Sequence, residues 1–180
     1  MLKNLLTMPK FLKITIAVLA FIGILLYSFM IYTKSHSPGA TAIYGANGLE
    51  ISVKYCQPAK KGRQIFGGIV PYGEVWRTGA NEATIISINK DVSVAGKPLK
   101  AGVYSLWTIP NQADFDVIFN SETGQWGTNH DPKLDVLKVK VPAQSQGNVV
   151  ENFLIDFPKS DSVVTMRLNW DQTQISVPFK

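Results

Sequence analysis

One stretch of the sequence gathers several side chains that can recognise a ligand. Residues 71–84 read PYGEVWRTGANEAT, and the side chains of interest are Trp76, Arg77, Asn81 and Glu82. The guanidinium of Arg77 is a rigid fork of donors that suits a carboxylate or a phosphate. The Thr78-Gly79 turn can bring backbone amides close to a ligand, which the polar side chains can then orient. We therefore expect a ligand-binding site in this loop.

Four further residues are candidates for the same site. Trp107 lies in a segment that reads as a strand, Trp126 and His130 lie in a second long loop, and Arg63 lies in the first long loop. Aromatic rings occur both in protein cores and in binding sites. The expected ligand is a small polar or glycan-like molecule, with an envelope protein as the other possible partner.

The same motif has a purely structural interpretation. Arg77 and Glu82 would then form a buried ion pair that pins the loop to the sheet. On this interpretation Trp76 fills the core and Asn81 caps a turn. The sequence leaves both interpretations open.

An enzyme is the weaker alternative. Glu82 or His130 would serve as the acid–base residue of an envelope hydrolase that acts on glycans or esters. The sequence has no G-x-S-x-G elbow, no His-x-His or Glu-x-x-His pair and no glycine-rich phosphate loop. We therefore expect no metal and no cofactor, and the chain gives no clear sign of being an enzyme.

The charge distribution gives no reason to expect nucleic-acid binding. The net charge is +5, but four of the 18 basic residues lie in the first 34 positions, where no acidic residue occurs. The remaining 14 basic and 13 acidic residues nearly balance. Nucleic-acid binding requires a basic excess on one face. Cys56 is the only cysteine, so no disulfide can form within the chain.

A long apolar run near the N-terminus predicts a membrane helix. Residues 14–33 are 20 consecutive uncharged residues, enough for a helix of about 30 Å, the thickness of the hydrocarbon core of a bilayer. Lys3, Lys10 and Lys13 precede the run and only Lys34 follows closely, which predicts a cytoplasmic N-terminus for residues 1–13. Cleavage as a signal peptide is the alternative. We expect a single-pass anchor in the inner (cytoplasmic) membrane, a linker over residues 34–47, and a periplasmic or extracellular domain over residues 48–180.

The rest of the chain has the pattern of an all-β domain. Apolar residues alternate with polar ones over Leu49–Tyr55, and further strand-like segments follow, namely 83–89, 92–99, 103–109, 115–119, 137–141, 153–157, 164–170 and 175–179. Short strands separated by turn residues are typical of a sandwich or a barrel. The sequence therefore predicts an antiparallel, jelly-roll-like β-sandwich of about nine strands.

Several blocks of the sequence resemble one bacterial protein family. YCQPAKKGRQIFGGIVPYGEVWRTGANEATIIS, GKPLKAGVYSLWTIP, FDVIFNSETGQWGT and the closing LNWDQTQISVPF are similar to blocks of the DUF2911 family. The resemblance covers about Gly48 to Phe179 and implies a secreted or membrane-associated β-rich domain without an assigned activity. Glu74 departs from the family pattern, in which a Lys is more common.

Three functional hypotheses follow. The leading one is a membrane-anchored binding module that uses the loops around Trp76 to Glu82. The second is the envelope hydrolase, and the third is a structural scaffold without a site.

Overall fold

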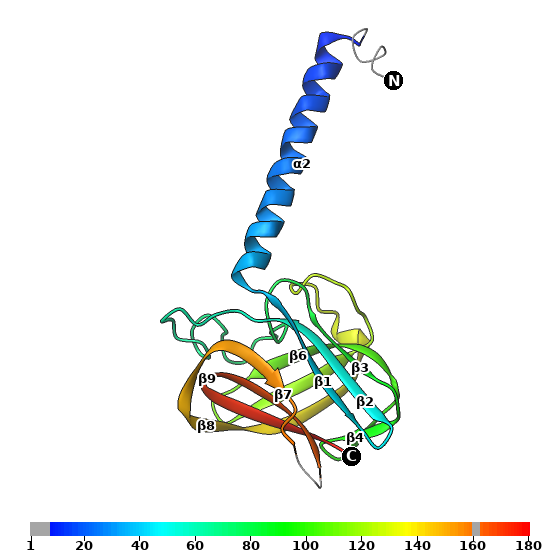
Figure 1. Cartoon of the computed structure of the whole chain (residues 1–180), viewed down its shortest axis with the longest axis vertical. Coiled ribbons are helices and arrows are strands. Elements are labelled where there is room, and N and C mark those ends of the chain that lie inside the picture. The colour runs from blue at the N-terminus through cyan, green and yellow to red at the C-terminus, as the bar shows by residue number, and fades with distance from the viewer. Residues whose placement is uncertain (1–7, 160–162) are drawn as a thin grey trace. The chain divides into compact units, whose positions relative to one another are not determined.

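The described part of the chain forms a long α-helix followed by a β domain. The computed structural model describes residues 8–159 and 163–180, so residues 1–7 of the expected cytoplasmic segment lie outside the described part. Contacts divide the chain into two units, one ending at His36 and one running from Ser37 to Lys180. Among the described residues, the first unit holds helix α2 (Lys10–His36) and the second holds nine strands; Figure 1 shows the helix and the strand-rich domain.

Helix α2 contains the whole of the expected membrane segment. It begins directly after Pro9 and has 27 residues, which corresponds to a length of about 40 Å. Large apolar side chains are exposed all round it, as a helix in lipid requires. The helix is long and apolar enough to cross a membrane, a property that signal sequences share.

The nine strands pair antiparallel throughout, which confirms the predicted fold class. Their bounds are β1 (Gly39–Ala46), β2 (Leu49–Cys56), β3 (Thr84–Ile88), β4 (Val92–Val94), β5 (Lys97–Leu99), β6 (Gly102–Pro110), β7 (Asp114–Asn120), β8 (Asp135–Asp156) and β9 (Val164–Phe179). A short 3₁₀ helix, η1 (Pro132–Leu134), precedes β8. The spatial order is β1-β2-β3-β6-β7-β8-β9-β4-β5, so the strands form a meander and only the β4–β5 hairpin lies out of sequence.

Strand β8 is continuous, although the sequence pattern predicts two separate strands in its place. Its first part pairs with β7 over residues 135–142, and its second part pairs with β9 over residues 143–156. Apolar alternation lapses between these parts because residues 144–149 are largely exposed polar residues. The backbone pairing continues because β9, a strand of 16 residues, pairs along the second part of β8, so β8 joins the two halves of the sheet around a single main core.

Strand β1 occupies most of the segment that the sequence predicts to be a linker. It pairs with β2 from Gly39 opposite Cys56 to Ala46 opposite Leu49. The turn between them is Asn47-Gly48, with φ values of 52° and 74°, as a two-residue hairpin turn requires. Most residues of this strand are small, so the sequence shows no clear alternation of large apolar and polar residues there.

Strand β6 is buried on both faces, and this arrangement positions the candidate residues. Tyr104, Leu106 and Thr108 face the main core. Trp107 points to the opposite face and forms a second cluster with Ala83 and Ile118. The loop of residues 121–134 lies over this second cluster.

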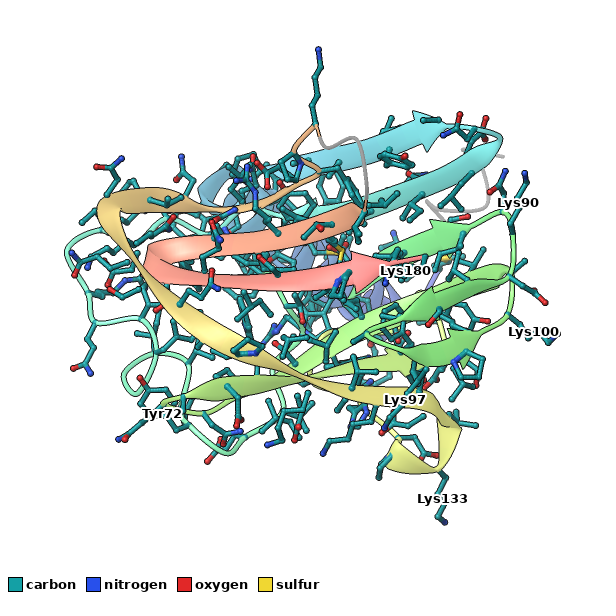
Figure 2. All side chains as sticks on the ribbon, turned by 90° about the horizontal axis from the view of Figure 1, so that it is seen from below. Tyr72, Lys90, Lys97, Lys100, Lys133 and Lys180 are labelled. Carbon is teal, nitrogen blue, oxygen red and sulfur yellow. The ribbon has the colours of Figure 1, made fainter. Side chains whose placement is uncertain are left out.

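Lysine side chains point outward from the domain. Figure 2 shows Lys90, Lys100 and Lys133 reaching away from turns and strand ends. Lys100 pairs with Asp91 at 2.8 Å, and two lysines of β8 pair across the strands, Lys138 with Asp116 and Lys140 with Asp114, at 3.0 Å each.

Candidate functional site

The two long loops that carry the sequence candidates lie against each other. Glu82 and Trp126 form an antiparallel bridge, in which the Ala83 N–H donates to the Gln125 carbonyl at 3.3 Å. The Gly127 N–H donates to the Asn81 carbonyl at 3.1 Å. Side chains alternate across such a bridge. Asn81 and Gln125 therefore point toward the sheet, while Glu82 and Trp126 point to the other side.

Trp76 is partly buried and packs against the main core. Its backbone exchanges two hydrogen bonds with Thr108 of β6, at 2.7 and 2.9 Å. Its ring stacks on Trp170 with centroids 5.7 Å apart and meets Phe66 and Phe153 edge-on. The indole N–H donates to the Gly79 carbonyl at 3.0 Å. These contacts give Trp76 a packing role.

Arg77 points away from the main core and crosses Gly127. Only a glycine fits at position 127, because a Cβ there would collide with the Arg77 side chain. The guanidinium donates to the Asn81 carbonyl at 3.3 Å. Burial lowers the pKa of Arg77, and no carboxylate opposes that shift within the described part of the chain. Among the described residues Arg77 is thus held by a backbone carbonyl rather than by the buried ion pair with Glu82 that the structural interpretation expects.

Asn81 occupies a strained and buried position. Its φ of 60° lies in the left-handed region, and the residue is only 8% exposed. The Nδ2 atom of Asn81 and the Oε1 atom of Gln125 are both buried without a hydrogen-bond partner among the described residues. Such atoms are uncommon in folded proteins, because each costs about 1–3 kcal/mol of desolvation when unpaired.

Trp107 and His130 form a separate polar cluster under the second loop. The indole N–H of Trp107 donates to Ser105 Oγ at 2.8 Å, and the His130 ring lies 5.0 Å from the Trp107 ring. His130 Nε2 lies 2.9 Å from Asp135 Oδ1, which also accepts from Asn120 Nδ2 at 2.8 Å. No serine or cysteine hydroxyl or thiol bonds to His130 within residues 8–159 and 163–180. The described residues also contain no group of three or more metal-ligating side chains.

Arg63 belongs to its own turn. Its Nε donates to the Lys60 carbonyl at 2.9 Å and its Nη2 donates to the Ala59 carbonyl at 2.6 Å. The eight sequence candidates therefore fall into four groups. Trp76 packs against the main core, and Arg63 belongs to its own turn. The other two groups are neighbours: Arg77, Asn81, Glu82 and Trp126 at the Glu82–Trp126 bridge, and Trp107 with His130 in the polar cluster.

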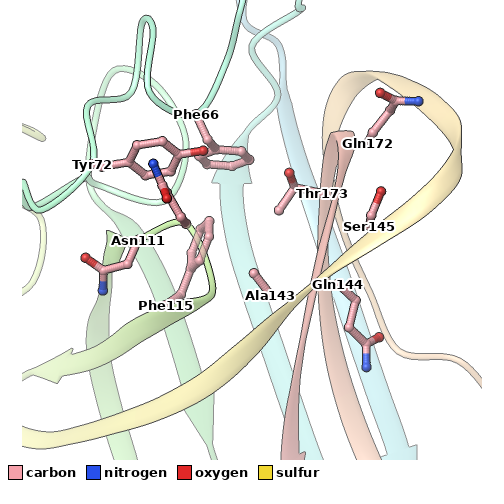
Figure 3. Close-up of a pocket in the computed structure, with 10 residues that line it drawn as sticks. Phe66, Tyr72, Asn111, Phe115, Ala143, Gln144, Ser145, Gln172 and Thr173 are labelled. Atoms are coloured by element: carbon pink, nitrogen blue, oxygen red, sulfur yellow. The ribbon is translucent and has the colours of Figure 1, made fainter.

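A pocket lies at the other end of the first long loop. Figure 3 shows aromatic rings on one side of it and polar side chains of β8 and β9 on the other. Its volume is about 170 Å³. The lining residues are Phe66, Tyr72, Asn111, Gln112, Phe115, Ala143, Gln144, Ser145, Gln172 and Thr173, none of which is charged.

The aromatic wall is held from behind by the core. The Phe66 ring meets the Phe115 ring edge-on at 5.0 Å and the Trp76 ring at 5.9 Å. Tyr72 is 42% exposed and lies against Gly67, where a Cβ would come within 2.5 Å of the tyrosine ring. Trp76 thus supports the pocket without lining it.

The polar wall comes from two similar triplets on paired strands. Gln144-Ser145-Gln146 of β8 runs opposite Gln172-Thr173-Gln174 of β9, with Ser145 beside Thr173. The pairing register shifts after Ser145, and such irregularities are frequent next to binding sites. The side chains of Ser145 and Gln172 make no hydrogen bond to other described residues, so they are available to a ligand.

One protein-family model matches most of the chain. The model of DUF2911, a protein family of unknown function, matches residues 37–179. The chain belongs to the DUF2911 family. No curated protein and no solved structure matches it.

The DUF2911 match begins at residue 37, and this start agrees with a domain that includes β1. Within this DUF2911 domain the sequence analysis missed the pocket. Phe66 and Tyr72 lie in the first long loop, but neither has a directly adjacent polar residue that would mark it as part of a binding site. The repeated Gln-Ser-Gln and Gln-Thr-Gln triplets were the one visible clue to the opposite wall.

Proposed function

We propose that this chain is a membrane-anchored, extracytoplasmic DUF2911 domain that binds a small, neutral, hydroxyl-rich ligand, such as one sugar ring of an envelope glycan. The binding site is the uncharged pocket between Tyr72 and the β8–β9 strands. The observation that carries this proposal is the pairing of an aromatic wall with a wall of carboxamides and hydroxyls.

The chemistry of the two walls favours a sugar over other small ligands. An aromatic face packs against the apolar C–H face of a sugar ring, and carboxamides can both donate to and accept from its hydroxyls. An ionic ligand would lose its hydration in this pocket without meeting a compensating charge. The volume is smaller than the roughly 300–1,000 Å³ of drug-sized sites, so we expect one ring or the end of a chain to enter.

The proposed location of the domain outside the cytoplasm is supported by helix α2 and its flanking charges. Lys10 and Lys13 lie at the start of the helix and Lys34 lies near its end. Excess positive charge before the span favours an N-terminus in the cytoplasm and a domain outside it. Envelope glycans are then the hydroxyl-rich molecules nearest to the domain.

The hydrolase alternative has one supporting feature, the hydrogen-bonded pair of His130 and Asp135. A catalytic triad would also need a nucleophile bonded to the imidazole. We therefore prefer binding to hydrolysis.

A titration of the full chain tests the proposal. The protein is kept in a detergent without a sugar headgroup and titrated with neutral mono- and oligosaccharides by calorimetry. We expect binding that Tyr72→Ala or Gln172→Ala weakens at least about tenfold, a change equivalent to 1.4 kcal/mol. Trp126→Ala is the matched control, an exposed aromatic residue outside the pocket. No binding to any of the sugars, or equal affinities for the pocket variants and the control, would contradict the proposal.

A further inference from the structure

The bridge between Glu82 and Trp126, here called the loop bridge, lies next to a second set of polar groups that the proposed function does not use. Arg77 is a half-buried cation, and its one hydrogen bond to a described residue is the bond to the Asn81 carbonyl. A guanidinium has five N–H donors. The ion pairs formed between described residues do not include Arg77. Most of its donor capacity is therefore open to a ligand.

A second donor lies next to this cation on the same side of the bridge. Asn81 is more than nine-tenths buried, and its Nδ2 has no partner among the described residues. Since Asn81 and Gly127 face each other across the bridge, the Asn81 side chain and the Arg77 stem that crosses Gly127 share one face. The same face holds Gln125, whose Oε1 is an unpaired acceptor.

The segment that carries these groups is fixed before any ligand arrives. Thr84 Oγ1 donates to the Thr78 carbonyl at 2.7 Å, and the Thr84 N–H donates to the Arg77 carbonyl at 3.3 Å. Thr78 Oγ1 in turn donates to Thr108 Oγ1 of β6 at 3.2 Å. A backbone held in this way loses little entropy when a ligand binds, which favours affinity.

We propose that Arg77 and Asn81 form a second binding site, which takes an oxyanion, either a carboxylate or a phosphate. The planar fork of Arg77 matches two oxygens of such a group, and Asn81 Nδ2 supplies a further N–H donor. Gln125 Oε1 would accept a hydrogen bond from a neighbouring hydroxyl of the same ligand. The site differs from the uncharged pocket in both position and chemistry.

Thermal unfolding of the full chain in detergent tests this site with two probes. Sodium phosphate and sodium acetate are compared with sodium chloride at constant ionic strength. We expect one or both ions to raise the unfolding temperature, because a ligand that binds the folded state stabilises it. A response to phosphate alone identifies a phosphate site, and a response to acetate identifies a carboxylate site. A response no larger than that to chloride overturns the proposal.

Two variants and a control assign the response to these residues. Arg77→Gln removes the cation, and Asn81→Gly removes the carboxamide while tolerating the left-handed backbone. Both variants should lose the ion-dependent shift, and Lys90→Gln, an exposed lysine in a turn, should keep it. If Arg77→Gln fails to fold, Asn81→Gly decides the test together with the Arg77 Nε–H resonance of the wild-type protein, which should move on titration with the probe. An unmoved resonance, or a full shift in Asn81→Gly, overturns the proposal.

Discussion

Gly67 fixes the position of the Tyr72 ring. Its φ is +77°, and a Cβ there would come within 2.5 Å of that ring. Gly67→Ala should therefore both strain the backbone and push Tyr72 out of the pocket. The strain alone costs about 1–2 kcal/mol, and the clash adds about 1–3 kcal/mol. Chemical denaturation and the sugar titration should show lower stability and weaker binding together.

Gly73 provides the matched control for this prediction. It has the same φ of +77°, but nothing lies within 4 Å of a Cβ at that position. Gly73→Ala should show only the cost of the backbone strain and should leave sugar binding unchanged. Equal losses of stability and binding in the two variants would refute the role given to Gly67.

The two tryptophans of the candidate loops should differ strongly in their effect on stability. Trp76 stacks on Trp170 and meets Phe66 and Phe153, whereas Trp126 is 40% exposed. Trp76→Ala should lower the free energy of unfolding by about 3–5 kcal/mol. Trp126→Ala should change it by no more than about 0.5 kcal/mol. Urea denaturation measures both, and similar values would contradict the packing role of Trp76.

Ion pairs join strands β7 and β8, and their contribution to the stability of the fold depends on pH. Hydrogen bonds from Lys140 and then from Asn111 lower the pKa of Asp114. A lowered carboxyl pKa contributes stability above the unfolded value of about 3.9, and this stability is lost as the pH falls through the folded value. We therefore expect the contribution of Asp114 to disappear only in acid, below about pH 4.

Carboxyl NMR titration of the Lys140→Gln variant tests the effect of Lys140 on the pKa of Asp114. The pKa of Asp114 should rise in the variant because its main hydrogen-bond donor is gone. Asp91, whose pKa is lowered chiefly by Lys100, should titrate as in the wild-type protein. An unchanged titration of Asp114 would mean that Lys140 is not the cause of its low pKa.

Some strands could be predicted from the alternation of apolar and polar residues, and others could not, for physical reasons. Leu49–Cys56 alternates cleanly because one face of β2 packs on the core and the other is wet. β1 gave no such signal, because Gly39, Ala40 and Ala46 are small and its pairing depends on β2. The middle of β8 gave none either, since its partner is β9 and its exposed residues need not be apolar.

The pocket could not have been predicted from local patterns. Its walls come from four segments, which contain Phe66 and Tyr72, Asn111 to Phe115, Ala143 to Ser145, and Gln172 and Thr173. Only the pairing of strands distant in sequence brings them together. The bridge between Glu82 and Trp126 is similar, because it joins two loops that the sequence suggested separately. Helix α2 was the easy case, because its signal is a single run of apolar residues.

At the scale of the whole molecule, the proposed topology predicts which end of the chain faces the cell exterior. We expect an epitope tag after Lys180 to bind antibody on intact spheroplasts, and a tag before Met1 to bind only after permeabilisation. The membrane fraction should retain the full-length chain after alkaline extraction if, as proposed, α2 serves as an uncleaved anchor. Exposure of the N-terminal tag, or release of a shortened chain, would contradict the anchor and its orientation.

The most direct test of the central claim is an isotope-filtered NOE experiment on the full chain with a neutral sugar that binds it. The account predicts NOEs between protons of the sugar ring and the ring protons of Phe66 and Tyr72, which line the pocket in Figure 3. It also predicts that these NOEs disappear in Gly67→Ala and persist in Gly73→Ala. A bound sugar whose NOEs lead instead to Trp126, or to no aromatic residue of the pocket, would contradict it.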